Sequence, residues 1–136
     1  MAQFAKNTTV PVERSQTEIR NILGKYKADG FACGWEGKLD CLSWTYKGVH
    51  YILRVERPSN AQQHRQRWRA LRLVIYAKLE AVDCGISTVE REFMAWAMGP
   101  DGQTLGDVLS DRMLDWSKQG LKMLPAPTNE GVGDRA

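Results

Sequence analysis

The sequence predicts an α+β fold: one helix, a three-stranded antiparallel β-meander, a long helix and then two shorter helices. Three observations support this prediction. Apolar residues first recur with a helical period, three short runs rich in aromatic and β-branched residues follow, and a long stretch of helix-forming residues comes next. With 136 residues, 43% of them hydrophobic, the chain suits one domain, expected over residues 1–120 and followed by a flexible tail at residues 121–136.

The first helix is expected to follow an extended segment, residues 1–14. Ser15 to Glu18 match a capping box, in which the Ser15 hydroxyl accepts from the Glu18 amide while the Glu18 side chain reaches back. Asp29-Gly30 is the predicted stop, because glycine readily adopts the left-handed conformation that ends many helices. Between these signals lies one apolar helix face, made of Ile19, Ile22, Leu23 and Tyr26.

Three strands are predicted at Phe31–Trp35, Leu39–Tyr46 and Val49–Val55, joined by two-residue turns at Glu36-Gly37 and Lys47-Gly48. Side chains of a strand alternate between two faces, so a turn of fixed length also fixes which residues lie opposite each other. The second turn pairs apolar residues throughout, namely Tyr46 with Val49, Trp44 with Tyr51 and Leu42 with Leu53.

The first turn pairs Phe31 with Leu42 and puts Cys33 and Trp35 on the same apolar face. A three-residue loop would instead set Cys33 opposite Cys41, which invites a disulfide, and would turn Phe31 and Trp35 away from that face. The apolar pattern favours the two-residue turn and reduced cysteines.

A long helix is predicted from Asn60 to Asp83, with Ser59 as its cap. Its core stripe recurs at helical spacing and comprises Trp68, Leu71, Ile75, Leu79 and Val82. Because Leu73, Val74 and Tyr76 widen this stripe, we expect the helix to be buried on more than one side, which also permits homodimerisation.

Two shorter helices are predicted to close the other side of the domain. A second capping box, Ser87 to Glu90, opens a helix that runs through Met98, and Thr104 caps a last helix that runs through Lys118. Their inward-facing residues are expected to be Val89, Phe93 and Trp96 in the first and Leu105, Val108, Leu109, Met113 and Trp116 in the second.

Candidates for metal binding or catalysis are few. The three cysteines and two histidines lack the close spacing of a zinc site, so no metal and no cofactor are predicted. His50 falls on the outer strand face near Cys41 and Ser43, and Asp111 and Asp115 lie one helical turn apart, but neither arrangement is typical of a catalytic centre. Because no phosphate-binding loop or metalloprotease motif occurs either, the sequence predicts a protein that is not an enzyme.

The cysteine count and the N-terminus bear on localisation. Three cysteines without a secretion signal are typical of reduced thiols, and residues 1–10 lack the apolar region of a signal peptide. No apolar run approaches the roughly 20 residues that span a bilayer. A cytoplasmic protein with no membrane association is therefore expected.

The net charge of +3 conceals an uneven distribution. Residues 1–79 hold 14 basic and 6 acidic side chains, whereas residues 80–115 hold 2 basic and 8 acidic ones. Arg65, Arg69 and Arg72 share one face of the long helix, and a planar guanidinium suits phosphate recognition. The predicted nucleic-acid-binding residues are Arg65, Arg67, Arg69, Arg72 and Lys78, extended by Lys47 and Lys25.

An alternative needs no external partner for these arginines. They would then form a solvated helix face, or pair within the chain with acids of the later segment, such as Glu90, Glu92, Asp107 and Asp111. The binding hypothesis therefore requires the arginine row to face outward.

Several short segments resemble uncharacterised proteins encoded by bacteriophages and prophages. These segments are Val10–Ser15, Ala28–Phe31, Arg67–Leu71, Ala77–Glu80 and Pro100–Gly102 followed by Thr104. The resemblance implies a viral origin and action in the cytoplasm of a bacterial host, without an established activity. The order helix, three strands, helix is also similar to the topology of double-stranded RNA-binding domains.

These observations together predict a phage-encoded accessory protein that binds DNA or RNA through the arginine face with low base specificity. The alternative is an inhibitor or adaptor that binds a host protein, with no catalysis.

Overall fold

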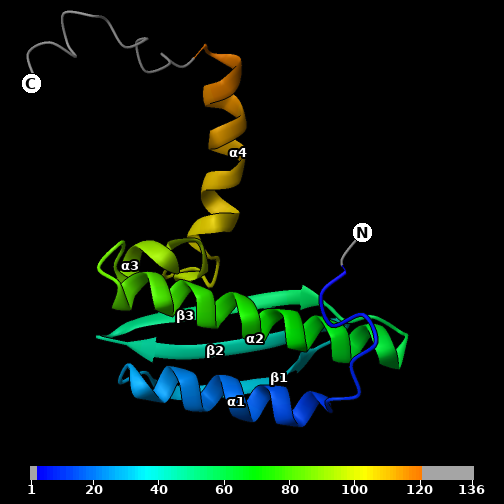
Figure 1. The fold of residues 1–136 in the computed structure, drawn as a ribbon. Coiled ribbons are helices and arrows are strands. Elements are labelled where there is room, and N and C mark those ends of the chain that lie inside the picture. Colours follow the sequence, from blue (N-terminus) through cyan, green and yellow to red (C-terminus); the bar gives the residue numbers. More distant parts are fainter. Residues whose placement is uncertain (1–2, 121–136) are drawn as a thin grey trace, which may run out of the picture.

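A computed structural model describes residues 3–120 and confirms the α+β fold and its order of elements. The elements are α1 (Val12–Lys25), β1 (Asp29–Glu36), β2 (Leu39–Tyr46), β3 (Val49–Glu56), α2 (Ala61–Asp83), α3 (Val89–Glu92), the 3-10 helix η1 (Met94–Trp96) and α4 (Leu105–Lys118). The sheet is antiparallel with order β1-β2-β3, and α1 and α2 lie side by side over one of its faces (Figure 1). The tail predicted at residues 121–136 lies outside the described residues.

The core fills the space between the helix pair and the sheet. An aromatic cluster occupies the end nearest α3, where the ring centroid of Trp44 lies 5.5 Å from that of Tyr51 and 5.1 Å from that of Phe93. The other buried apolar residues of this core are Ile19 and Leu23 of α1, Leu42 of β2, Trp68, Ile75 and Leu79 of α2, and Val89 of α3, whereas the buried Ile52 of β3 lies outside this cluster. None of the helices within residues 3–120 is long and apolar enough to cross a membrane.

The first helix starts earlier than the capping box predicts. Pro11 is the N-cap, and its carbonyl accepts from the amides of Arg14 and Ser15 at 3.2 and 3.3 Å. Ser15 therefore lies inside the first turn, where it is fully buried, and the predicted capping box is wrong.

The first helix also ends before Gly30. The amide of Ala28 donates to the carbonyl of Leu23 and that of Lys27 to the carbonyl of Gly24, which is the paired bonding of a Schellman motif. Lys27, at φ 63°, takes the left-handed position that the sequence assigns to Gly30.

The hairpin between β2 and β3 has the predicted register, with Tyr46 opposite Val49. The hairpin between β1 and β2 differs, because Glu36 pairs with Leu39 and Cys33 with Leu42. A type II′ turn needs glycine at its first loop position, and Gly37, at φ +56°, meets that need only if the loop is Gly37-Lys38.

This shift moves the β1 register by two residues from the predicted one, so the β1 side chains keep their predicted faces. Phe31 does not pair with Leu42 as predicted, because the shifted register pairs Leu42 with Cys33, and an irregularity between Asp29 and Ala32 leaves Phe31 out of the ladder. Cys33 and Cys41 are free thiols, as the apolar pattern predicts.

Asn60, not Ser59, caps α2, and its side chain accepts from the Gln63 amide at 3.0 Å.

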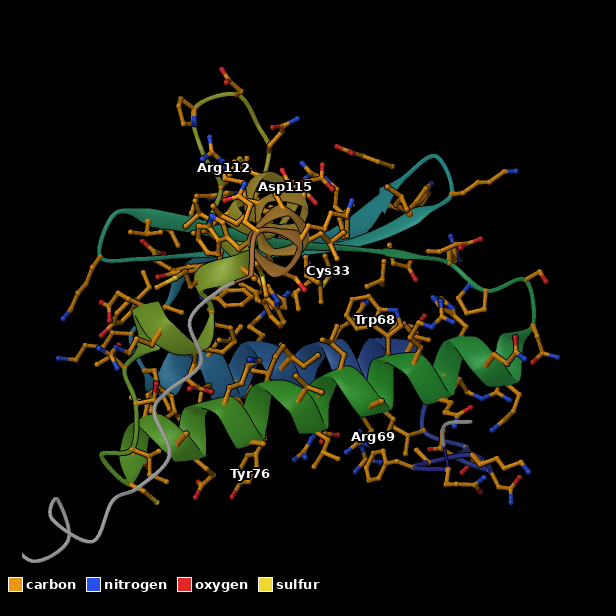
Figure 2. All side chains as sticks on the ribbon, turned by 90° about the horizontal axis from the view of Figure 1, so that it is seen from above. Cys33, Trp68, Arg69, Tyr76, Arg112 and Asp115 are labelled. Atoms are coloured by element: carbon orange, nitrogen blue, oxygen red, sulfur yellow. The ribbon has the colours of Figure 1, made fainter. Side chains whose placement is uncertain are left out.

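The prediction that α2 is buried on more than one side is wrong. Leu73, Val74 and Tyr76 are 40%, 41% and 45% exposed, and Figure 2 shows Tyr76 on the side of α2 that faces away from the sheet.

The segment after α2 forms less helix than predicted. In place of one helix from Ser87 to Met98, α3 is a single turn capped by Thr88 and is followed by η1. The bounds of α4 and its Thr104 cap are as predicted, and Asp107 completes a capping box there, but α4 has no buried residue and projects away from the sheet and from α2 (Figure 1). The expectation that its apolar residues face inward, closing the domain, is therefore wrong.

The aromatic cluster predicts different losses of stability for substitutions at two neighbouring positions, Phe93 and Met94. Phe93→Ala removes a fully buried ring and should lower the free energy of unfolding by about 3–5 kcal/mol, measured by urea denaturation. Met94→Ala is the matched control, because Met94 is 48% exposed and its loss should cost less than about 0.5 kcal/mol. Equal losses for the two variants would contradict this assignment of the core.

Candidate functional site

The middle of the predicted arginine row forms ion pairs with α1. The Arg69 guanidinium holds Glu18 through two hydrogen bonds, of 2.8 Å to Oε1 and 3.2 Å to Oε2. Arg72 Nε donates to the same Oε1 at 2.7 Å, and Arg14 Nε donates to Oε2 at 3.2 Å. Arg69 also donates to the buried hydroxyl of Ser15 at 3.3 Å, so these contacts join α2 to α1.

This arrangement has a clear electrostatic consequence. Hydrogen bonds from Arg69 and then Arg72, together with their positive charges, lower the pKa of Glu18 from 4.5 to about 2, against the opposing effect of burial. Glu18 therefore remains ionised down to strongly acidic pH. Its single negative charge is shared by three guanidinium groups, which leaves the cluster with a net positive charge.

The expectation that the row faces outward is wrong for Arg69 and Arg72, whose side chains are only 18% and 31% exposed. Pairing within the chain, the alternative reading, does occur, but the acid comes from α1 and not from the later acidic segment. Sequence reasoning assigned Glu18 to a capping box, and so missed it as the partner.

The remaining predicted cations are scattered. Arg65 donates to the Gln62 side chain, with its Nε buried and without a hydrogen-bond partner, and Arg67 donates to the Glu56 carbonyl. Lys78 donates to the Glu92 carbonyl at 2.9 Å and lies against the rings of Phe93 and Trp96. The last two predicted residues, Lys25 and Lys47, lie at the ends of α1 and β2, far from the start of α2 (Figure 1).

A cleft of about 580 Å³ lies where the start of α2 meets the β1–β2 hairpin and the N-terminal part of α1. Trp35 lines it from β1 and is 69% exposed, although its position on the inner sheet face predicts burial. The guanidinium carbon of Arg57 lies 5.6 Å from the centre of the Trp35 ring, a cation–π contact. His64 and Arg65 line the cleft from α2.

A buried carboxylate holds the inner wall of this cleft together. Asp40 is 4% exposed, and its Oδ2 lies 2.8 Å from His64 Nε2 and 3.3 Å from Trp68 Nε1. Figure 2 shows Trp68 pointing from α2 toward the sheet. Arg57 Nε lies 3.9 Å from the other carboxylate oxygen. These contacts satisfy a charge that would otherwise be costly to bury.

Neither His64 nor Asp40 is among the site residues predicted from the sequence. A signal was present, because Asp40 precedes Leu42 and Trp44 in the alternation of inward-facing positions of β2. An acid at an inward position of a strand needs a buried partner.

Burial raises the pKa of Cys33, which lines the cleft, to about 11, so that its thiol is protonated at neutral pH. His50 Nδ1 lies 3.2 Å from the Thr45 hydroxyl on the outer sheet face. Among residues 3–120, no three His, Cys, Asp or Glu side chains form a group that could hold a metal ion.

Comparisons with protein-family models, with curated proteins and with solved structures find no match to this chain. The chemistry of the site is therefore the basis on which a function can be proposed.

The Glu18 cluster predicts a pH-dependent stability. Glu18→Gln leaves Arg69 and Arg72 without a counter-charge and should lower the free energy of unfolding by about 2 kcal/mol at neutral pH. Because the folded pKa of Glu18 is about 2 and its ordinary value is 4.5, the wild-type advantage is complete above pH 4.5 and declines as the pH falls toward 2.

Urea denaturation at pH 7 and at pH 3 measures this difference, with Glu13→Gln as the control from the exposed side of α1. A Glu18→Gln variant as stable as wild type at pH 7 would show that the cluster does not hold the helices together.

Proposed function

We propose that this protein binds single-stranded nucleic acid, with little base selectivity, along the cationic end of α2. The observation that carries the proposal is the exposure of Trp35, a large ring that is 69% exposed at the cleft and has the Arg57 guanidinium over it. An exposed ring offers a platform for any base, and a guanidinium next to it can meet the adjoining phosphate.

The surroundings of Trp35 supply further positive charge. Lys38 is exposed in the β1–β2 loop, and Arg65 lines the cleft with one guanidinium nitrogen lacking a hydrogen-bond partner. A second cleft, of about 680 Å³, flanks the start of α2 and is lined by Lys6 and Arg67 together with Asn and Gln side chains. The first turn of α2 contains no acidic residue, so the positive end of the helix dipole adds to the attraction for phosphates.

This proposal keeps the predicted class of partner and changes the residues that bind it. Arg65 stays in the proposed surface, whereas Arg69 and Arg72 hold the two helices together. Stacking and phosphate contacts carry no sequence information, which suits a low-specificity accessory protein acting in a bacterial host, as the resemblance to phage proteins implies.

Titration of a labelled single-stranded oligonucleotide, followed by fluorescence anisotropy, tests the proposal. Trp35→Ala should weaken binding about 5- to 150-fold, the loss expected for one stacked base. Arg57→Ala should lower the slope of log affinity against log salt by about 0.7, the loss of one phosphate contact.

Lys47→Ala is the control, because it removes one positive charge from the opposite end of the molecule (Figure 1) and should leave both quantities unchanged. Equal losses for Lys47→Ala and Arg57→Ala, or no binding at low salt, would overturn the proposal. In the latter case, capture of a single host protein would favour the adaptor alternative.

A further inference from the structure

An apolar face of α4 is uncovered in the described part of the chain. Leu105, Val108, Met113 and Trp116 are 38%, 47%, 63% and 45% exposed, and their helical spacing puts them on one side. Only the base of α4 is held, where the Leu105 amide donates to the Ala97 carbonyl at 2.9 Å.

Such a helix needs packing to persist. At 14 residues, α4 is near the lower limit of length at which a helix is stable alone in water, even with its Thr104 capping box. Contiguous exposed apolar side chains mark interaction surfaces in soluble proteins. An apolar face of opposite charge would supply the packing that α4 lacks.

The outer side of α2 provides that face. Its small and apolar residues recur at helical spacing on the side opposite Trp68, and we call them the outer stripe: Ala70, Leu73, Val74, Ala77 and Ala81. Leu73 and Val74 are 40% and 41% exposed. The three alanines allow a second helix to approach the backbone of α2 closely.

The two helices carry opposite charge. α4 has three aspartates against one arginine and one lysine, whereas Arg67 is the cation of α2 on the side of the outer stripe, because Arg69 and Arg72 pair with Glu18. Asp107, Asp111 and Asp115 recur every four residues and form a ridge beside Val108. Arg67 occupies the corresponding edge of the outer stripe, one turn before Ala70 and two turns before Val74.

We propose that the chain forms a two-fold dimer in which α4 of each copy packs its apolar face on the outer stripe of the other copy. Within one chain this contact is not made, because α4 points away from α2 (Figure 1). The two-fold axis produces the contact twice, which buries both exposed apolar faces and sets the aspartate ridge beside Arg67.

Pairing of α4 with α4 is disfavoured by Arg112. Arg112 falls within the apolar face, between Leu105 and Trp116, near the middle of the helix. An antiparallel pair of α4 helices that matches Leu105 with Trp116 of the other copy would put each Arg112 opposite Leu109 in the apolar seam, about one turn from the other Arg112. On the outer stripe, Arg112 instead meets a helix that carries Glu80 one turn from Ala77.

Light scattering coupled to size-exclusion chromatography tests the arrangement on the full chain. Wild type should have the mass of a dimer. Met113→Glu on α4 and Val74→Glu on α2 should each raise the dimer dissociation constant at least tenfold. Leu114→Glu is the matched control, because Leu114 is 62% exposed on the opposite side of α4 and should change it less than twofold.

Mixing the two deficient variants gives a second readout. Because one of the two α4–α2 contacts is intact in a mixed pair, equimolar Met113→Glu and Val74→Glu should recover dimer that neither forms alone. Sensitivity to Met113→Glu alone would assign the dimer to α4–α4 pairing, and sensitivity to Val74→Glu alone to α2–α2 pairing. Either result, or a monomeric wild type, would overturn the proposal without bearing on Trp35.

Discussion

The ion pairs that Glu18 forms with Arg69 and Arg72 fix α1 beside α2, and much of the remaining structure depends on that placement. The two helices together cover one face of the sheet, and their packing encloses Ile19, Leu23 and Ile75. A carboxylate shared by several guanidinium groups is costly to desolvate but still more costly to leave unpaired, so the contact specifies how the helices align. Arg69 and Arg72, which the sequence suggests as binding residues, therefore stabilise the fold.

Because Arg69 and Arg72 pair with Glu18, an external anion would bind at other cations. The cations that still reach solvent near the start of α2 surround a cleft instead of forming a row, and they lie beside an exposed tryptophan. The cleft keeps its shape because Asp40 ties the β1–β2 hairpin to His64 and Trp68 of α2. Rigid support of this kind lets an open site hold its geometry before a ligand arrives.

Local signals predicted most of the fold. The turn at Lys47-Gly48 fixed the β2–β3 register, and helical periodicity located α2 and α4 within a residue or two. Errors arose where two local signals competed, as when Pro11 started α1 before the Ser15 capping box, or when Gly37 took the first place of its turn. For the candidate site, the sequence identified Arg65 but gave no prominence to Trp35, Arg57 or Asp40.

The sequence by itself determined the class of fold, the order of its elements and the excess of positive charge in the first 79 residues. These properties depend on the spacing of apolar residues and on composition, which are local. Only the tertiary structure decided which charges neutralise one another, which aromatic ring stays in solvent and which apolar helix faces lack a cover. The reason is that such contacts join residues far apart in the chain, as Glu18 and Arg69 are. The spacing of residues along the sequence does not predict these long-range contacts.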